Sequence, residues 1–273
     1  MRYIILFISV IFLVGCNEPT ISEPEKVAGI VHKVKFKEQL ESEIDLTLYE
    51  REPNEWGEIV TGVKTRFVTD EKEIALTFDA CGGDFGNGYD ETLITFLREE
   101  GIPATLFVNE RWILDNEETF LELANDRLFQ IENHGTTHAP LSVDGAEACG
   151  IPGTNSAEEV FAEIMDNHDT IKELTGRDMK LFRSGTAFYD EVAVELANDL
   201  GYEIVNFDIL GDAGATYSAA EVERALLGAE AGSIALLHMN QPNSGTADGV
   251  QAAVPLLQAA GFEFVQLADQ KLE

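Results

Sequence analysis

The stretch Ile74–Gly83 reads IALTFDACGG, and it predicts how the rest of the chain is arranged. Its first half is a short apolar run without polar alternation, which is typical of a strand covered on both faces in a parallel sheet. The run ends at Asp79, and the two glycines that follow allow a sharp turn. We therefore expect a buried strand that presents the Asp79 carboxylate at its carboxyl end. An aspartate that caps a nearby loop is the alternative.

Downstream of this stretch, apolar runs of strand length alternate with segments of helical periodicity. Seven strands are expected, beginning near residues 74, 104, 128, 181, 204, 234 and 262, and the helical segments include 90–100, 117–125, 190–200 and 247–260. Strict alternation of this kind predicts parallel strands. Because a closed barrel of this type usually has eight units, we expect a distorted seven-stranded parallel (β/α) barrel, with a doubly wound open sheet as the alternative.

The composition is that of one large folded domain. The chain has 273 residues, of which 45% are hydrophobic and 25% are charged. Asp and Glu number 50 against 18 Lys and Arg, so the formal charge is -32 and no basic block is dense enough to bind phosphates. This excludes nucleic acid as a partner and favours a neutral or cationic substrate.

The N-terminus has the pattern of an export signal. Arg2 precedes an apolar run, Ile4–Val14, that is too short to span a bilayer and is followed by Gly15 and Cys16. This ending resembles the lipobox of bacterial lipoproteins, which implies cleavage before Cys16 and lipid on its sulfur. We expect residues 1–15 to be a signal peptide, 16–55 an acidic tether and 56–273 the main domain, with the lipid holding the protein at the outer face of a bacterial membrane.

Two further cysteines, Cys81 and Cys149, remain if Cys16 carries lipid. An even pair in an exported protein is often bonded, and both residues fall in loops near the expected site. We therefore expect a disulfide between Cys81 and Cys149. Two separate small buried residues are the alternative.

A strongly polar side chain follows each of six predicted strands at the point where the strand ends. These residues are Asp79, Asn109, His134, Arg183, Asp208 and His238. Because the carboxyl ends of parallel strands meet at one face of a barrel, the six side chains would gather there. A carboxylate, an arginine and imidazoles on one face suit a hydrolytic site.

His134 and His138 have the spacing His-x-x-x-His. In a helical turn or a tight loop both imidazoles can reach one metal ion, and zinc is the common choice. A metal there would lower the pKa of a bound water to roughly 7 and polarise a carbonyl oxygen. Polar packing of the two rings is the alternative.

The order of these residues resembles that of the polysaccharide deacetylase family, also called carbohydrate esterase family four, over about residues 57–269. Thr77, Phe78 and Asp79 match the family motif Thr-Phe-Asp-Asp, and residues 133–138 match its second motif, Asn-His-Gly-Thr-Thr-His. Later matches are Arg183 in LFRSGTAFYD, Asp208 in NFDILGD and His238 in LLHMN.

The resemblance implies a role for each matched residue. Asp79 would be the general base, His134 and His138 metal ligands, Arg183 the residue that orients the base, His238 the general acid and Asp208 the residue that tunes it. These roles imply a metal-dependent enzyme, with zinc the expected metal, that removes N-acetyl groups from an amino-sugar polymer such as peptidoglycan or chitin-like material. The alternatives are an O-acetyl esterase on another glycan, and a glycan-binding lipoprotein with a degenerate metal site.

The sequence departs from the family at two motifs. Ala80 replaces the second aspartate, which is the family's third metal ligand, and Ser184 and Gly185 follow Arg183 where two prolines are usual. Catalytic zinc usually has three protein ligands, so we expect Asp84 to be the replacement, with Cys81 as a softer option if it is not in a disulfide. A turn residue ahead of Phe85 and Gly86 is the alternative for Asp84. A subgroup of the family that has Ala-Cys-Gly-Gly at this position also resembles this sequence in later segments. This indicates that the chain is a working variant of the family and not a decayed one.

Overall fold

The computed structural model describes residues 44–273. The strands of its main sheet are β2 (Glu73–Ala80), β3 (Ala104–Val108), β4 (Phe129–Asn133), β5 (Leu181–Phe182), β7 (Glu203–Ile204), β8 (Ile209–Leu210), β9 (Ser233–His238) and β10 (Glu263–Phe264). Two short strands, β1 (Trp56–Gly57) and β6 (Tyr189–Asp190), form a separate antiparallel pair. The helices are α2 (Glu91–Glu100), α3 (Glu110–Asp115), α4 (Glu117–Asn125), α5 (Ala157–Thr175), α6 (Glu191–Asp199), α7 (Ala219–Leu226) and α8 (Thr246–Ala259), with a 3-10 turn, η1 (Leu46–Tyr49).

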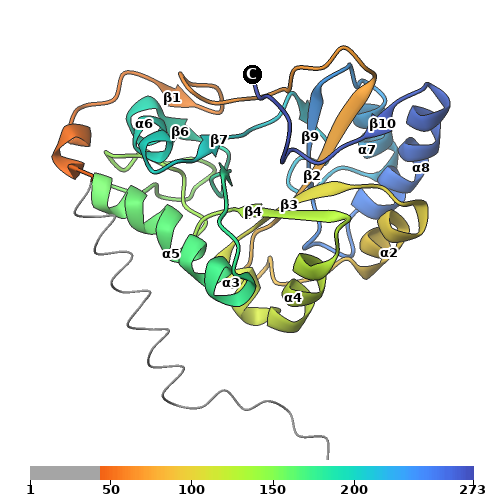
Figure 1. Ribbon diagram of the computed structural model, residues 1–273, viewed down its shortest axis with the longest axis horizontal. Helices are drawn as coiled ribbons and strands as arrows, with labels where there is room; N and C mark the ends of the chain where they lie inside the picture. Colours follow the sequence, from red (N-terminus) through yellow and green to blue (C-terminus); the bar gives the residue numbers. More distant parts are fainter. Residues whose placement is uncertain (1–43) are drawn as a thin grey trace, which may run out of the picture.

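Seven strands of the main sheet lie side by side in the order β7-β5-β4-β3-β2-β9-β8, and β10 pairs with the start of β2 (Figure 1). All of these pairings are parallel. The sheet curls into a distorted (β/α) barrel with helices outside it, so the predicted fold class is confirmed. The helices expected at 90–100, 117–125, 190–200 and 247–260 are α2, α4, α6 and α8.

The strand expected at 204–207 is formed only at its start, as the end of β7, and a second short strand, β8, follows at the opposite edge of the sheet. β7 pairs with β5 at one edge, and β8 pairs with β9 at the other. Residues 205–208 connect them, so the two edge strands are consecutive in the chain. The polar side chain of Asn206 interrupts the apolar run, because it is buried and donates to the backbone carbonyls of Glu58 and Ala187. This crossing explains why the barrel is distorted and why one site prediction, described below, is wrong.

The central strand β2 directs alternate side chains into two apolar cores. Phe78 and Ala80 pack with the helices in the larger core, whereas Ala75 belongs to the smaller core inside the barrel. Successive side chains of a strand point to opposite faces. Asp79 therefore lies on the inner side, Ala80 on the helix side, and Cys81 is the next residue that continues the inner series.

Residues 44–55 belong to the folded domain, although the sequence placed them in the tether. Tyr49 of η1 is buried and its hydroxyl donates to Asp199, while the backbone N–H groups of Asn54 and Glu55 donate to the carboxylate of Glu191. The expected signal peptide, Cys16 and most of the tether lie outside the described residues. Within residues 44–273, no helix is long and apolar enough to cross a membrane.

Candidate active site

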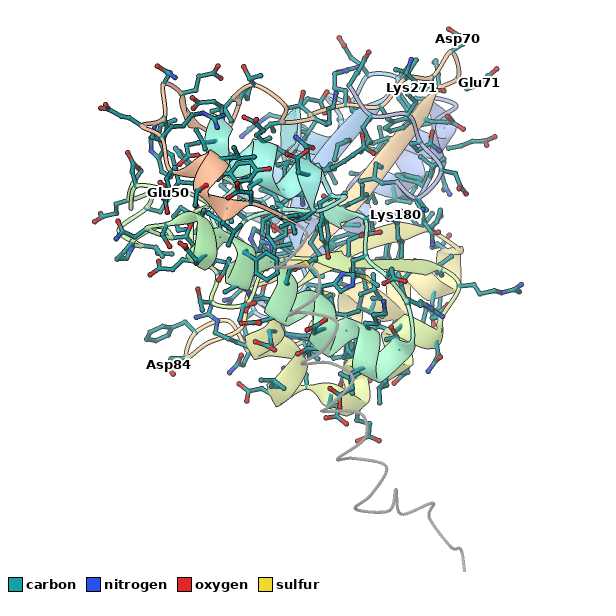
Figure 2. The ribbon with its side chains drawn as sticks, turned by 60° about the vertical axis from the view of Figure 1, so that its left-hand side comes forward. Glu50, Asp70, Glu71, Asp84, Lys180 and Lys271 are labelled. Atoms are coloured by element: carbon teal, nitrogen blue, oxygen red, sulfur yellow. The ribbon has the colours of Figure 1, made fainter. Side chains whose placement is uncertain are left out.

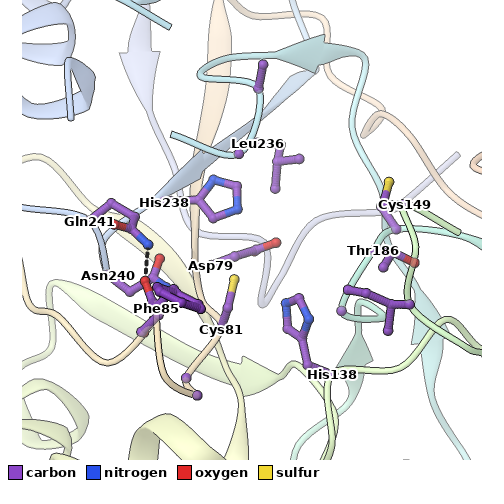
Figure 3. Close-up of a pocket in the computed structure, with 18 of the residues that line it drawn as sticks. Asp79, Cys81, Phe85, His138, Cys149, Thr186, Leu236, His238, Asn240 and Gln241 are labelled. Atoms are coloured by element: carbon purple, nitrogen blue, oxygen red, sulfur yellow. Dashed lines mark hydrogen bonds between the residues drawn. The ribbon is translucent and has the colours of Figure 1, made fainter. Parts of the chain in front are cut away.

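A cavity of about 630 Å³ opens at the carboxyl ends of β2 and β9. Asp79, Cys81, His138 and His238 all line it, and Figure 3 shows these four side chains pointing toward one another across the opening. Four chemically active groups from three parts of the chain thus share one cavity, and two of them, Asp79 and His238, are residues that the pattern of strand ends predicted there.

Asp79 is buried and fixed by Arg183. Its Oδ1 accepts from Arg183 Nη1 at 2.8 Å, and the fully buried guanidinium also donates to the backbone carbonyls of Val205 and Asn206. Burial alone would raise the pKa of Asp79, but the positive charges of Arg183 and His238 outweigh it and hold the pKa below its ordinary value. Asp79 is therefore an ionised carboxylate, which a general base requires.

The loop that carries both histidines is held by Glu163 of α5. This buried carboxylate accepts from the backbone N–H groups of Thr137, His138 and Ala139. Burial raises the pKa of Glu163, although these donors oppose the shift. A side chain at Gly185 would place its first carbon 2.3 Å from the carbonyl oxygen of His138. This contact leaves no room for a side chain at position 185.

His134 is oriented with one nitrogen toward Asp79 and Cys81. Its Nδ1 lies 2.9 Å from the backbone carbonyl of Arg183, so this nitrogen carries the proton and Nε2 has a free lone pair. Nε2 is 3.6 Å from Asp79 Oδ2 and 3.9 Å from Cys81 Sγ. Burial lowers the pKa of His134, which keeps the ring neutral as metal ligation requires.

Cys81, His134 and His138 could hold a metal ion, because their ligand atoms all lie within 4.8 Å of one another. His138 Nε2 is buried and has no hydrogen-bond partner among the described residues, which a metal would supply. The nearby histidines lower the pKa of the Cys81 thiol to about 6 against the opposing effect of burial. One cysteine sulfur and two histidine nitrogens are a ligand set that suits zinc.

The prediction of Asp84 as the third ligand is not supported by its position. Asp84 is exposed at the surface of the molecule (Figure 2). It does not belong to the group of ligand atoms formed by Cys81, His134 and His138. The two glycines after Cys81 have φ of 69° and 79°, and Asp84 after them lines the cavity as an exposed residue. Cys81, the alternative that the sequence offered, lies beside His134 and His138 where the third ligand was expected.

Asp212 is the carboxylate that contacts His238. Its Oδ1 lies 2.8 Å from His238 Nδ1, and its Oδ2 accepts from the backbone N–H of His238 and from the hydroxyl of Thr246. Burial alone would lower the pKa of His238, but Asp212 raises it well above the ordinary value. A hydrogen bond to Cys81 adds to this rise, so the imidazole is protonated. Because Asp212 engages Nδ1, the Nε2 proton is the one that a general acid would transfer.

The prediction that Asp208 tunes His238 is wrong. Asp208 accepts from Arg66, from the Ser233 hydroxyl at 2.8 Å and from the backbone N–H of Ile234 at 2.8 Å. Ser233 begins β9 and His238 ends it, and the two ends are about 16 Å apart at roughly 3.3 Å per residue, so Asp208 lies at the opposite end of the strand from the imidazole. The sequence treated Asp208 as a strand end, but β8 begins at the next residue.

The predicted disulfide is absent, because Cys81 and Cys149 are both free. Cys149 is exposed and lines the same cavity as Cys81 (Figure 3).

The buried Asn109, another of the strand-end residues, has a structural role: its side-chain amide donates to the carbonyls of His134 and Gly135.

Two site residues were missed by the sequence reasoning, Asp212 and Glu163. Asp212 is the first carboxylate after the short apolar pair Ile209–Leu210, so recognising that pair as a strand would have found it. Glu163 sits inside α5 among apolar neighbours, where a glutamate has no obvious solvent-facing position. A buried acid in a helix is a signal for such an anchoring role.

Sequence comparison agrees with this geometry. The family model described as polysaccharide deacetylase matches residues 67–205, which is just over half of the chain. The chain belongs to the polysaccharide deacetylase family. No curated protein matches it at the level of significance that we required.

Solved structures of the family share the fold. A peptidoglycan N-acetylglucosamine deacetylase gives a TM-score of 0.65 at 21% identity over 77% of this chain and 92% of that one. A family 4 carbohydrate esterase from Bacillus anthracis gives 0.58 at 25% identity, over 76% and 86%. A family 4 pseudoenzyme from Bacillus anthracis gives 0.64 at 18% identity, over 77% and 69%.

Proposed function

We propose that this protein is a zinc-dependent deacetylase that removes N-acetyl groups from an amino-sugar polymer. The observation that carries the proposal is the pairing of Asp79 with His238. They are direct neighbours in register on β2 and β9, and each has its own charged partner, Arg183 or Asp212. Arg183 favours the ionised base and Asp212 the protonated acid, which are the two states that amide hydrolysis needs at the same pH.

Zinc would be held by Cys81, His134 and His138, and when bound it supplies Lewis acidity that polarises the acetyl carbonyl and lowers the pKa of water. The distances leave Asp79 Oδ2 free on the side of these ligands, since Oδ1 is engaged by Arg183. Asp79 would use this oxygen to take the proton of the attacking water.

His238 would complete the reaction by giving its Nε2 proton to the departing amine. Asp212 holds the opposite nitrogen of the ring and stabilises the positive charge until this transfer. Phe207, Leu210 and Leu236 line the cavity beside His238 and provide an apolar wall for the acetyl methyl group.

The comparisons support the N-acetyl substrate and also raise a non-catalytic alternative. One structural neighbour is named as a peptidoglycan N-acetylglucosamine deacetylase and another as a pseudoenzyme. Here both the general base and the general acid are present with their partners, and Cys81 fills the gap left by Ala80. These contacts favour catalysis over binding alone.

Acetate release from matched N-acetylated and O-acetylated saccharides tests the proposal. We expect the zinc-loaded protein to release acetate from N-acetylglucosamine polymers or peptidoglycan, and His238→Ala to lose this activity. Release from O-acetylated glycans alone would assign the protein as an esterase. Saccharide binding without any acetate release would assign it as a binding protein.

We also propose that the mature protein begins at Cys16 and is lipid-anchored to the outer face of a bacterial membrane, with residues 16–43 as the tether. The support is the sequence of residues 1–16 alone. Expression in bacteria supplied with a labelled fatty acid should label the wild type and leave Cys16→Ser unlabelled. Equal recovery of both in the soluble fraction would contradict the anchor.

A further inference from the structure

Arg183 takes its orientation from the backbone of residues 205 and 206. Its Nε donates to the carbonyl of Val205 at 3.0 Å, and its Nη2 donates to the carbonyl of Asn206 at 3.1 Å. The Phe107 ring covers one face of the guanidinium, with the ring centroid at 4.2 Å. The guanidinium is fully buried, so water cannot replace a contact that is lost. A shift of this backbone would therefore move Arg183 and weaken its bond to Asp79.

The side chain of Asn206 joins this backbone to two other segments. It is 1% exposed, and its Nδ2 donates to the carbonyls of Ala187 and Glu58, at 2.9 and 2.6 Å. Ala187 belongs to the turn that follows Arg183, and Glu58 follows β1 in the N-terminal part of the domain. Both residues line the cavity. One buried amide thus connects the crossing at 205–208 to two parts of the cavity wall.

The hydroxyl of Tyr189 completes this network. The residue is fully buried, and its hydroxyl donates to Asn206 Oδ1 and accepts from the backbone N–H of Ser184, both at 2.9 Å. Burial raises the pKa of Tyr189 to about 12, so the hydroxyl keeps the proton that it donates. A proline at position 184, which is usual in the family, has no N–H and would leave the hydroxyl without this donor. The turn after Arg183 is therefore held by hydrogen bonds instead of by stiff proline rings.

We propose that Tyr189 and Asn206 are positioning residues, which fix the turn at 184–188 against the crossing at 205–208 and so hold Arg183 beside Asp79. Neither residue lines the cavity, so both act through Arg183 and not on the substrate. The inference rests on the proposed function, because Asp79 is the general base of that reaction. It also gives a physical reason why this chain can do without prolines after Arg183.

The main test is Tyr189→Phe, which removes the hydroxyl and keeps the ring. We expect kcat for acetate release to fall about tenfold, with KM unchanged and one zinc still bound per chain. A purely structural role would lower the free energy of unfolding and leave kcat of the folded protein unchanged. Tyr49→Phe is the matched control: Tyr49 is also buried, but its hydroxyl donates to Asp199, so kcat should stay at the wild-type value.

A double-mutant cycle tests whether the two residues act together. Asn206→Ala should lower kcat more than Tyr189→Phe, because it removes three hydrogen bonds. The double variant should lose less than the product of the two single losses, because the residues share a contact. A loss equal to that product, or wild-type kcat in Tyr189→Phe, would overturn the proposal.

Amide hydrogen exchange separates this inference from the proposed function, because it needs no turnover. We expect Tyr189→Phe to exchange faster than the wild type at residues 183–188, while the amides of α2 exchange at the wild-type rate. If exchange rises in this way and the wild type releases no acetate, only the deacetylase proposal fails. Unchanged exchange at residues 183–188 overturns the positioning role whether or not acetate is released.

Discussion

Asp208 and Asp212 are four residues apart, yet they serve opposite ends of β9. Asp208 joins Arg66 to Ser233 and Ile234 at the start of the strand, whereas Asp212 holds the imidazole of His238 at its end. The chain between the two aspartates contains β8, which pairs in parallel with β9. Along β8 the chain passes from one end of the barrel to the other.

The comparison teaches that residue type alone does not assign a role in this fold. At the amino end of the barrel, the carboxylate of Asp208 joins three segments of the chain through hydrogen bonds. At the carboxyl end, the carboxylate of Asp212 keeps His238 protonated. Substitutions at the amino end should therefore change stability with little effect on chemistry, and those at the carboxyl end should change chemistry most.

The largest effect is expected for Asp79→Asn, at the carboxyl end of β2. The amide cannot accept the proton of water, so turnover should fall by at least roughly 10²-fold. The variant should still fold, since Arg183 keeps its bonds to the carbonyls of Val205 and Asn206. Acetate release and circular dichroism check both statements, and near-normal turnover in the folded variant would refute the assigned role.

The second largest effect is expected when the thiolate of Cys81 is removed. We expect Cys81→Ala to weaken zinc binding by at least about 100-fold, because two imidazoles remain as ligands. The wild type loaded with cobalt should show a thiolate-to-cobalt charge-transfer absorption that the variant lacks. The same absorption in Cys81→Ala, or tight binding without it in the wild type, would remove Cys81 from the site.

Asp212→Asn should lower kcat by roughly tenfold or more and change the pH profile. The Asp212 carboxylate raises the pKa of His238, so its loss lowers that pKa and the acid loses its proton at a lower pH. The alkaline limb of kcat against pH should therefore move to lower pH. An alkaline limb that stays in place would show that another group is the acid.

The smallest effect on chemistry is expected for Asp208→Asn, the matched control. This variant should keep the wild-type pH profile while the free energy of unfolding falls by about 1–3 kcal/mol, because a charge-assisted bond to Arg66 is weakened. Urea denaturation and the pH profile measure the two quantities. A moved alkaline limb in this variant would erase the contrast between the two ends of the barrel.

Much of the fold could be predicted from local patterns. β2 is buried on both faces and the amphipathic helices have clear ends, so their positions are readable from periodicity. The crossing at 205–208 is not, because its strands have two residues each and their pairing is decided by partners far away in sequence. That single misread strand moved the predicted partner of His238 from Asp212 to Asp208.

The sequence predicted some residues of the candidate site correctly and others not. Asp79, the two histidines and Arg183 follow strands of clear pattern and lie where the sequence placed them, while their catalytic roles stay predictions. The third ligand depended on the direction of a side chain after β2. Strand alternation continued by one residue points to Cys81. Asp84 was expected instead because the ligand that Ala80 replaces is an aspartate and Cys81 was a candidate only outside a disulfide.

The most direct test of the account is acetate release from an N-acetylated glycan by one protein preparation in three states: as purified, after chelation, and after zinc is restored. We predict that release falls to background on chelation and returns with one zinc per chain. A protein that binds zinc at Cys81, His134 and His138 and still releases no acetate would contradict the central claim that this barrel mouth is a hydrolytic site.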